Sequence, residues 1–135
     1  MRQLLKPFYW CALALWPWFA SAFGSVPDTA PQAQAQVRCG WFHNPSPNNV
    51  SLTDRDGEWT IAMQGQHDAK GDWPEFKKKQ WVASGNGSYG YGCACLRVVA
   101  DRETYRISSI LSSTVKPLAT CRRDRKLKSP ALRSH

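Results

Sequence analysis

The sequence predicts a small, mainly β domain: a twisted antiparallel sheet or a partly open barrel, with little helix and two disulfides. Two observations lead to this fold class. Short apolar segments alternate with polar residues at a period of two, and turn-forming Gly, Pro, Asn and Asp residues separate them. Four cysteines remain once a 22-residue leader is set aside. An even number of cysteines in a small exported chain is typical of paired disulfides.

The first 22 residues have the features of a secretory signal peptide. Arg2 and Lys6 give a positively charged start, and residues 7–20 form an uncharged, mostly apolar run of 14 residues. This run is shorter than the ~20 residues of a membrane-spanning helix. Small residues at positions 20–22 suit a signal peptidase, so we predict cleavage after Ala22 and a periplasmic or secreted protein with no stable membrane anchor. An uncleaved anchor is the alternative.

The mature chain divides into a linker, a domain and a tail. Residues 23–37 are rich in Pro, Ala and Gln and are predicted to be a flexible linker. The folded domain is expected over residues 38–127 and a disordered basic tail over residues 128–135. From Arg122 onward there are six cations and one acid, whereas residues 39–121 hold nine cations and eight acids. The tail is therefore either a solvated terminus or attracted to an anionic surface. Nucleic acid is not an expected partner of an exported protein.

Turn residues set the predicted elements in the first half of the domain. Two prolines and three asparagines predict a loop over residues 44–49. Alternation predicts strands over residues 50–52 and 59–63, which a hairpin turn at Asp56-Gly57 joins. Residues 65–76 are predicted to be a loop, in which Trp73-Pro74 opens a single helical turn. A short strand is predicted over residues 80–82, before a turn at residues 85–87.

The second half contains the longest predicted strand, residues 91–100. Cys93 and Cys95 share one of its faces, and Ala94, Leu96 and Val98 share the other. A turn near residues 101–103 leads into a strand over residues 105–111. Residues 117–127 are predicted to form a short helix, with Leu118 and Cys121 on one face. The whole domain is thus expected to hold about five short strands.

Cys39, Cys93, Cys95 and Cys121 are predicted to form two disulfides. Because Cys93 and Cys95 lie on the same face of one strand, separate bridges to Cys39 and Cys121 fit disulfide geometry better than a bond between them. The pairing Cys39–Cys93 with Cys95–Cys121 is slightly preferred, and the crossed pairing stays open. A thiol-redox centre would need a helix N-terminus that the surrounding residues do not suggest. A four-cysteine zinc site would normally use two close pairs.

No catalytic, cofactor-binding or metal-binding residue is assigned, and no cofactor is expected. An EF-type calcium loop around residues 54–58 fails because its first and twelfth positions would be Leu52 and Met63. No serine stands in a G-x-S-x-G setting. The acids that could supply a carboxylate pair for glycan cleavage lie in predicted turns or loops, where solvation is the default: Asp54, Asp56, Asp68, Asp72 and Glu75.

Aromatic residues are the remaining candidates for a site. A small domain poor in Leu and Ile can build its core from Trp and Tyr, and Trp59 and Trp81, which lie in strands, are expected there. Aromatic side chains in loops can stack on sugar rings or anchor a protein partner. The candidate ligand contacts of this kind are Trp73, Tyr89, Tyr91 and Trp41.

Several short motifs in a fixed order resemble an uncharacterised family of small exported bacterial proteins, a domain of unknown function. The motifs are Cys-Gly-Trp-Phe from Cys39, Asp-Arg-Asp-Gly-Glu-Trp from Asp54, Gly-Asp-Trp-Pro from Gly71 and Tyr-Gly-Tyr-Gly-Cys-Ala-Cys-Leu from Tyr89. The resemblance covers about residues 38–127 and implies a Gram-negative envelope setting. It carries no activity, ligand or catalytic residue.

Three functions are compatible with these observations. The leading hypothesis is a non-enzymatic binding or inhibitory module of the bacterial cell envelope, with an envelope glycan or another exported protein as its partner. The second is a hydrolase that cleaves envelope polymers through loop carboxylates. The third is a thiol-redox protein that uses Cys93 and Cys95.

Overall fold

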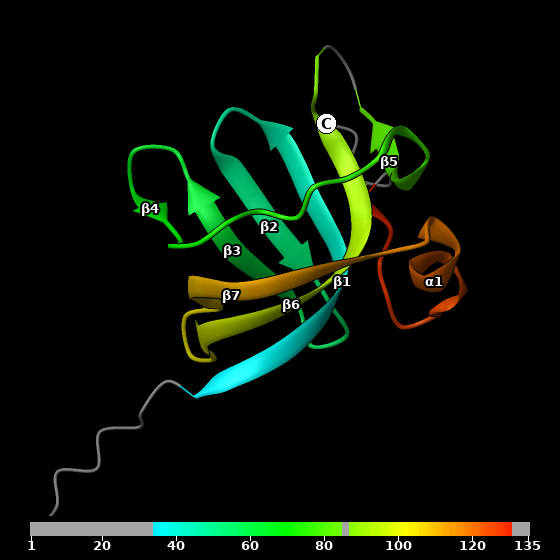
Figure 1. Ribbon diagram of the computed structural model, residues 1–135. Helices are drawn as coiled ribbons and strands as arrows, with labels where there is room; N and C mark the ends of the chain where they lie inside the picture. The colour runs from blue at the N-terminus through cyan, green and yellow to red at the C-terminus, as the bar shows by residue number, and fades with distance from the viewer. Residues whose placement is uncertain (1–33, 85–86, 131–135) are drawn as a thin grey trace, which may run out of the picture. The chain divides into compact units, whose positions relative to one another are not determined.

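The computed structural model describes residues 34–84 and 87–130. Strands dominate these ranges (Figure 1), and the predicted mainly β fold with little helix is confirmed. One 3-10 turn, η1 (Lys78–Gln80), and one short helix, α1 (Leu118–Arg123), accompany the strands. The strands are β1 (Ala35–Ser46), β2 (Asn49–Thr53), β3 (Glu58–Met63), β4 (His67–Asp68), β5 (Trp81–Ala83), β6 (Gly90–Asp101) and β7 (Arg106–Lys116).

Five of the strands close into a ring. Antiparallel ladders join β1 to β2, β2 to β3 and β6 to β7, and β1 also pairs with β6. The ring closes where β3 meets β7 in one parallel pair, Thr60 opposite Arg106, and the Thr60 N–H donates to the Tyr105 carbonyl at 2.8 Å. Because this junction is so short, the ring is not a regular barrel. The predicted antiparallel sheet is therefore a mixed one.

Strand β1 differs most from the sequence-based expectation. No strand is predicted over residues 38–43 and a loop is predicted over residues 44–49, yet β1 runs from Ala35 to Ser46. Gly40 allows β2 to come close, since a Cβ there would lie 2.0 Å from the Thr53 carbonyl oxygen. Pro45 lies where the ladder to β2 is interrupted, so its missing N–H costs no ladder bond.

The early start of β1 also shortens the predicted linker. The last three of the residues assigned to that linker, residues 35–37, belong to the strand and pair with β6. Residues 23–33 of the predicted linker, the predicted signal peptide and the last five residues of the predicted tail lie outside the described residues.

The other predicted strands are present, each close to its expected bounds. Strands β2, β3, β5 and β6 start and end within one residue of the predictions, and the turn at Asp56-Gly57 joins β2 to β3. Strand β7 continues to Lys116, five residues beyond its predicted end. The predicted helical turn at Trp73-Pro74 is wrong: the turn η1 forms four residues later, and Pro74 is buried in extended coil. Part of the predicted turn at residues 85–87 lies outside the described residues.

The main core fills the inside of the ring. The inward face of β6 is the one that alternation predicts, because Ala94, Leu96 and Val98 are buried there. Trp59 is also in this core, as predicted, and Trp81 packs at its margin against Phe76. The largest fully buried side chains are Trp59, Leu52, Ile61, Leu96 and Ile107.

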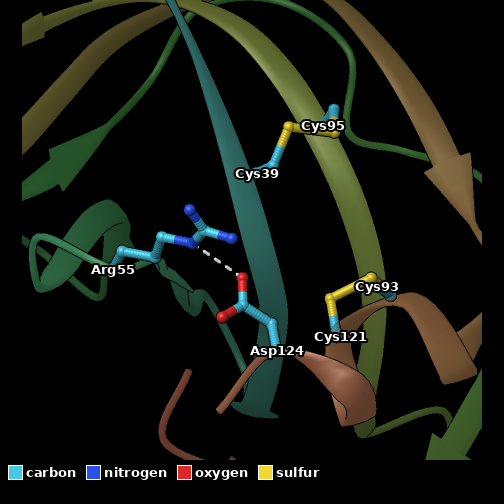
Figure 2. The surroundings of a disulfide bond; sticks show 6 residues. All are labelled: Cys39, Arg55, Cys93, Cys95, Cys121 and Asp124. Atoms are coloured by element: carbon cyan, nitrogen blue, oxygen red, sulfur yellow. Dashed lines mark hydrogen bonds and ion pairs between the residues drawn. A yellow bond between two sulfur atoms is a disulfide. The ribbon is translucent and has the colours of Figure 1, made fainter. Parts of the chain in front are cut away.

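A second, smaller cluster lies under α1. Trp41 is 2% exposed and packs there with Cys93 and Cys121, and the partly buried Leu118 and Leu127 border it. Cys93 is bonded to Cys121, which ties α1 to β6 (Figure 2). The short helix predicted over residues 117–127 is present but ends at Arg123, and Leu118 and Cys121 lie on its inner face.

The second disulfide crosses from β1 to β6. Cys39 stands directly opposite Cys95 in the β1–β6 ladder and is bonded to it, with 4.0 Å between the Cα atoms. Two disulfides are thus confirmed, but the preferred pairing of Cys39 with Cys93 is wrong. The register explains why: the residue opposite Cys93 on β1 is Trp41.

These disulfides indicate an oxidising, extracellular environment, because cytosolic thiols are normally kept reduced. Across the described ranges, no helix combines the length and the apolar character that crossing a bilayer would require.

Candidate functional site

The candidate site is an open depression of about 370 Å³ where two turns meet. Asp56 comes from the turn between β2 and β3, and Arg102 and Tyr105 come from the turn between β6 and β7. Trp59, near the start of β3, completes the lining. The hydrogen bond from Thr60 to the Tyr105 carbonyl holds the two turns together. The closure of the ring therefore creates the site.

Arg38 of β1 supports the depression from within the fold. Its side chain is 6% exposed, and its Cζ lies 4.0 Å from the centroid of the Trp59 ring. The guanidinium donates to Asp54 Oδ2 at 3.0 Å, to Gln36 Oε1 at 2.9 Å through Nε, and to Asp56 Oδ2. A buried charge needs such partners, because desolvation without them is costly. Arg38 is thus a fixed structural cation beneath the site.

The turn between β2 and β3 holds Asp56 in place. Asp54 Oδ1 accepts the backbone N–H groups of Asp56 at 2.8 Å and Gly57 at 3.0 Å, the pattern of an Asx turn. The hydrogen bond from Arg38 lowers the pKa of the Asp56 carboxyl, and Arg102 adds a smaller effect in the same direction. Asp56 therefore presents a carboxylate at the rim of the depression at neutral pH.

Tyr105 has an unusual backbone conformation. Its φ is +52°, in the left-handed region that bulky residues rarely occupy. Its ring centroid lies 4.8 Å from that of Trp59, and the residue is 41% exposed. Asp101 braces the turn by accepting the Glu103 N–H and the Thr104 hydroxyl, both at 2.8 Å. The buried Arg38 guanidinium, the buried Trp59 indole and the exposed Tyr105 ring therefore follow one another from the interior toward the surface.

Trp59 carries an unsatisfied donor. Its residue is 1% exposed, and its indole Nε1 has no hydrogen-bond partner among the described residues. A buried donor without an acceptor costs free energy, about 1–3 kcal/mol in typical proteins.

The four aromatic residues predicted as ligand contacts lie elsewhere. Trp41 is buried under α1, and the partly buried Tyr91 meets it edge to face with 5.3 Å between ring centroids. Trp73 is partly buried against Phe42, at 6.1 Å between centroids. Tyr89 is partly buried just before β6. The structure brings Trp41 and Tyr91 together, and none of the four lines the depression.

Sequence reasoning missed the residues of this site. Asp56 is predicted as part of a hairpin turn and as one of five solvated loop acids, and Tyr105 is predicted as the first residue of a strand. Arg38 is a single cation at the edge of the predicted domain. The one available signal in the sequence is the presence of charged residues in two predicted turns, at Asp56 and at residues 101–103. That the two turns meet follows from the pairing of β3 with β7 in the structure.

The acidic residues do not assemble a metal site within the described ranges, where no group of three or more His, Cys, Asp and Glu side chains lies close enough to hold an ion. Asp54 already uses both carboxylate oxygens, one for backbone N–H groups and one for Arg38. Asp68, Asp72 and Glu75 are exposed outside the depression.

Comparison with known proteins places the chain in a family. No curated protein and no solved structure gives a significant match to it. The family described as "Protein of unknown function (DUF4087)" matches residues 33–128, a range that includes both disulfides and every residue of the depression. The match covers well over half of the chain and confirms the resemblance to an uncharacterised domain family. The chain belongs to the DUF4087 family of proteins of unknown function.

Proposed function

We propose that this protein is a non-enzymatic binding module of the bacterial cell envelope, and that the depression around Tyr105 binds a saccharide segment of an envelope glycan. The observation that carries the proposal is the exposed Tyr105 ring, held in a left-handed backbone conformation above Trp59 and beside Asp56 and Arg102. Export through a cleavable signal peptide to the periplasm or beyond is part of the proposal, and the two disulfides support it.

The lining has the chemistry that a sugar requires. An aromatic ring offers an apolar face to the C–H groups of a pyranose. The Asp56 carboxylate accepts hydrogen bonds from hydroxyl groups, and the Arg102 guanidinium donates to hydroxyl or carboxylate oxygens. The volume of about 370 Å³ is at the small end of the range for ligand sites, which suits one or two sugar units.

The conformation of Tyr105 supports a binding role. A bulky residue with positive φ costs about 1–3 kcal/mol, and such conformations occur preferentially at binding and catalytic sites. Asparagine or glycine would adopt the same backbone at lower cost but would leave the depression without its exposed ring. The conformational free energy of the positive φ at Tyr105 therefore accompanies an exposed aromatic ring that asparagine or glycine would not provide.

Binding is better supported than the other two functions. A carboxylate hydrolase needs two acids with free oxygens on either side of the scissile bond. Among the described residues, Asp56 is the one acid that lines the depression, and the buried Asp54 has both of its oxygens occupied. A redox centre at Cys93 and Cys95 would require the two to exchange with each other, yet each is bonded to a different distant cysteine.

Isothermal titration calorimetry with soluble muropeptides, released from purified peptidoglycan by a muramidase, tests the proposal. We expect saturable binding by the wild-type protein and an affinity about tenfold lower for Tyr105→Asn, since tenfold corresponds to ~1.4 kcal/mol, the size of one aromatic contact. Asparagine tolerates the left-handed backbone, so this substitution removes the ring with little disturbance of the turn.

Tyr89→Asn is the matched control, because it removes a partly buried tyrosine that does not line the depression. The proposal predicts wild-type affinity for this variant. If Tyr89→Asn lost binding and Tyr105→Asn kept it, the result would instead favour a binding site at the aromatic residues before β6. Absence of wild-type binding to muropeptides and to deacylated lipopolysaccharide would contradict the glycan proposal.

A further inference from the structure

Two basic segments from distant parts of the chain are attached to neighbouring residues of β6. The turn η1, with Lys78 and Lys79, leads directly into β5, whose Trp81 pairs with Gly92. The next residue of β6, Cys93, is bonded to Cys121 in α1. Lys116, close before α1, pairs with that same Cys93, and in Figure 1 β5 and α1 both lie at the right of the view. The fold thus brings two cationic segments close to one another.

We call these side chains the cationic face. All eight are exposed, and none of them takes part in the ion pairs that Arg38, Arg55 and Arg102 form within the described residues. The members of the cationic face are Lys77, Lys78, Lys79, Arg122, Arg123, Arg125, Lys126 and Lys128.

The acid nearest to these cations is already neutralised. Asp124 is the single acid between residues 122 and 128, and its carboxylate accepts a hydrogen bond from Arg55 at 2.7 Å (Figure 2). That hydrogen bond lowers the pKa of the Asp124 carboxyl. Because Arg55 shares the charge of Asp124, which also interacts with Lys126, this one acid compensates little of the charge of the five cations around it. On the η1 side, Glu75 is the nearest acid in the sequence.

The remainder of the domain has the opposite balance. Outside the cationic face, residues 34–130 hold seven cations and nine acids. The positive charge of the protein is therefore concentrated on the cationic face. A charge distribution of this kind orients a protein relative to a surface of opposite sign.

The arrangement fits an extended anionic surface better than a small anion. The charges are spread over two segments, they sit on long flexible side chains, and none of them lines the depression. Between the arginines and β7, the exposed residues of α1 are the small Ala119 and Thr120, which allow a surface to approach closely. Clusters of four to eight Lys and Arg residues are typical of contacts with anionic lipid headgroups.

We propose that the cationic face docks this protein on a bilayer of anionic phospholipid, with the phosphate headgroups as the ligand. The contact is peripheral and electrostatic, and it involves none of the residues that line the depression. Docking therefore does not depend on the saccharide proposal, and either can fail alone.

Vesicle co-sedimentation tests the docking proposal with the mature protein purified after export. The vesicles contain phosphatidylglycerol and phosphatidylcholine in a one-to-three ratio, and phosphatidylcholine vesicles serve as the neutral reference. We expect binding to the anionic vesicles only, with an affinity that falls steeply as salt is added. Because each cation near such a surface contributes about a factor of five, Arg122→Gln with Arg123→Gln should weaken binding at least tenfold. Lys77→Gln with Lys78→Gln and Lys79→Gln should weaken it further.

The matched control is Arg97→Gln with Arg106→Gln, which removes two exposed cations from β6 and β7 outside the cationic face. We expect it to change the affinity less than threefold, and thermal unfolding checks that every variant is folded. Equal losses in the two double variants would show that net charge alone acts and would overturn the proposal. So would capture by an anionic polysaccharide without binding to the vesicles. Tyr105→Asn should bind the vesicles like the wild type.

Discussion

At the scale of single residues, the site depends on Arg38. One guanidinium links the turn that carries Asp56 to the Trp59 ring and satisfies the buried Asp54. The exposed side chains of the depression therefore rest on a cation that no ligand needs to touch. This separates two arginines with different roles: Arg38 maintains the geometry, and Arg102, whose side chain is 72% exposed, is available for contact.

Substitution of each arginine should show this difference in stability. Arg38→Met should lower the free energy of unfolding by about 3–5 kcal/mol, because it leaves the Asp54 carboxylate buried without its partner. Arg102→Gln should lower it by less than about 1 kcal/mol, because its pair with Asp56 is exposed and 3.4 Å long. Urea-induced unfolding monitored by tryptophan fluorescence measures both. Similar losses in the two variants would contradict the assignment of Arg38 as the buried support.

Residue-scale features of the site could not be predicted from the sequence. Nothing local to Tyr105 signals a positive φ, since the residues that favour that conformation are Gly, Asn and Asp. Arg38 and Asp54 lie on strand and turn segments whose contact depends on how β1 pairs with β2. The hairpin at Asp56-Gly57 could be predicted, because its turn chemistry is local.

At the scale of elements, the β1–β6 register decides the disulfide pairing. Alternation along β6 correctly separates the cysteines from the inward Ala94, Leu96 and Val98. It cannot say which cysteine faces Cys39, because that depends on a partner strand. Strand β1 was itself difficult to predict: it contains Gly40 and Pro45, and its adjacent residues Trp41 and Phe42 are both buried, since α1 covers the outer face. Burial on both faces removes the alternation that marks a strand.

The two disulfides should differ in their access to reductant. Cys39 is exposed on the outside of the sheet, whereas Cys93 and Cys121 are 2% and 3% exposed beneath α1. Thiol–disulfide exchange requires access to a sulfur, so mild reduction of the native protein should open Cys39–Cys95 first. Alkylation followed by peptide mass mapping identifies the freed cysteines. Earlier release of Cys93 and Cys121 would contradict the packing of α1 over that bond.

At the scale of the whole molecule, a small ring of strands carries two separate surfaces. The ring and its two disulfides provide a rigid framework, and on the loop-entropy account each bond adds roughly 3.5–4 kcal/mol of stability. The depression lies where the ring closes between β3 and β7, and the cationic face lies around η1 and α1. Composition and cysteine number predicted the framework well, because both are global properties. They could not locate either surface, because each one combines segments that only the closed ring brings together.

The most direct test of the binding site is the indole N–H region of an NMR spectrum, recorded on isotope-labelled protein during titration with muropeptides. The described residues contain four tryptophans, Trp41, Trp59, Trp73 and Trp81, so each indole N–H reports on a different place. The Trp59 indole signal should shift saturably, because the Trp59 side chain lines the depression, and the signal of Trp41 under α1 should stay in place. Saturable shifts at Trp41, Trp73 or Trp81 with a stationary Trp59 signal would contradict the account.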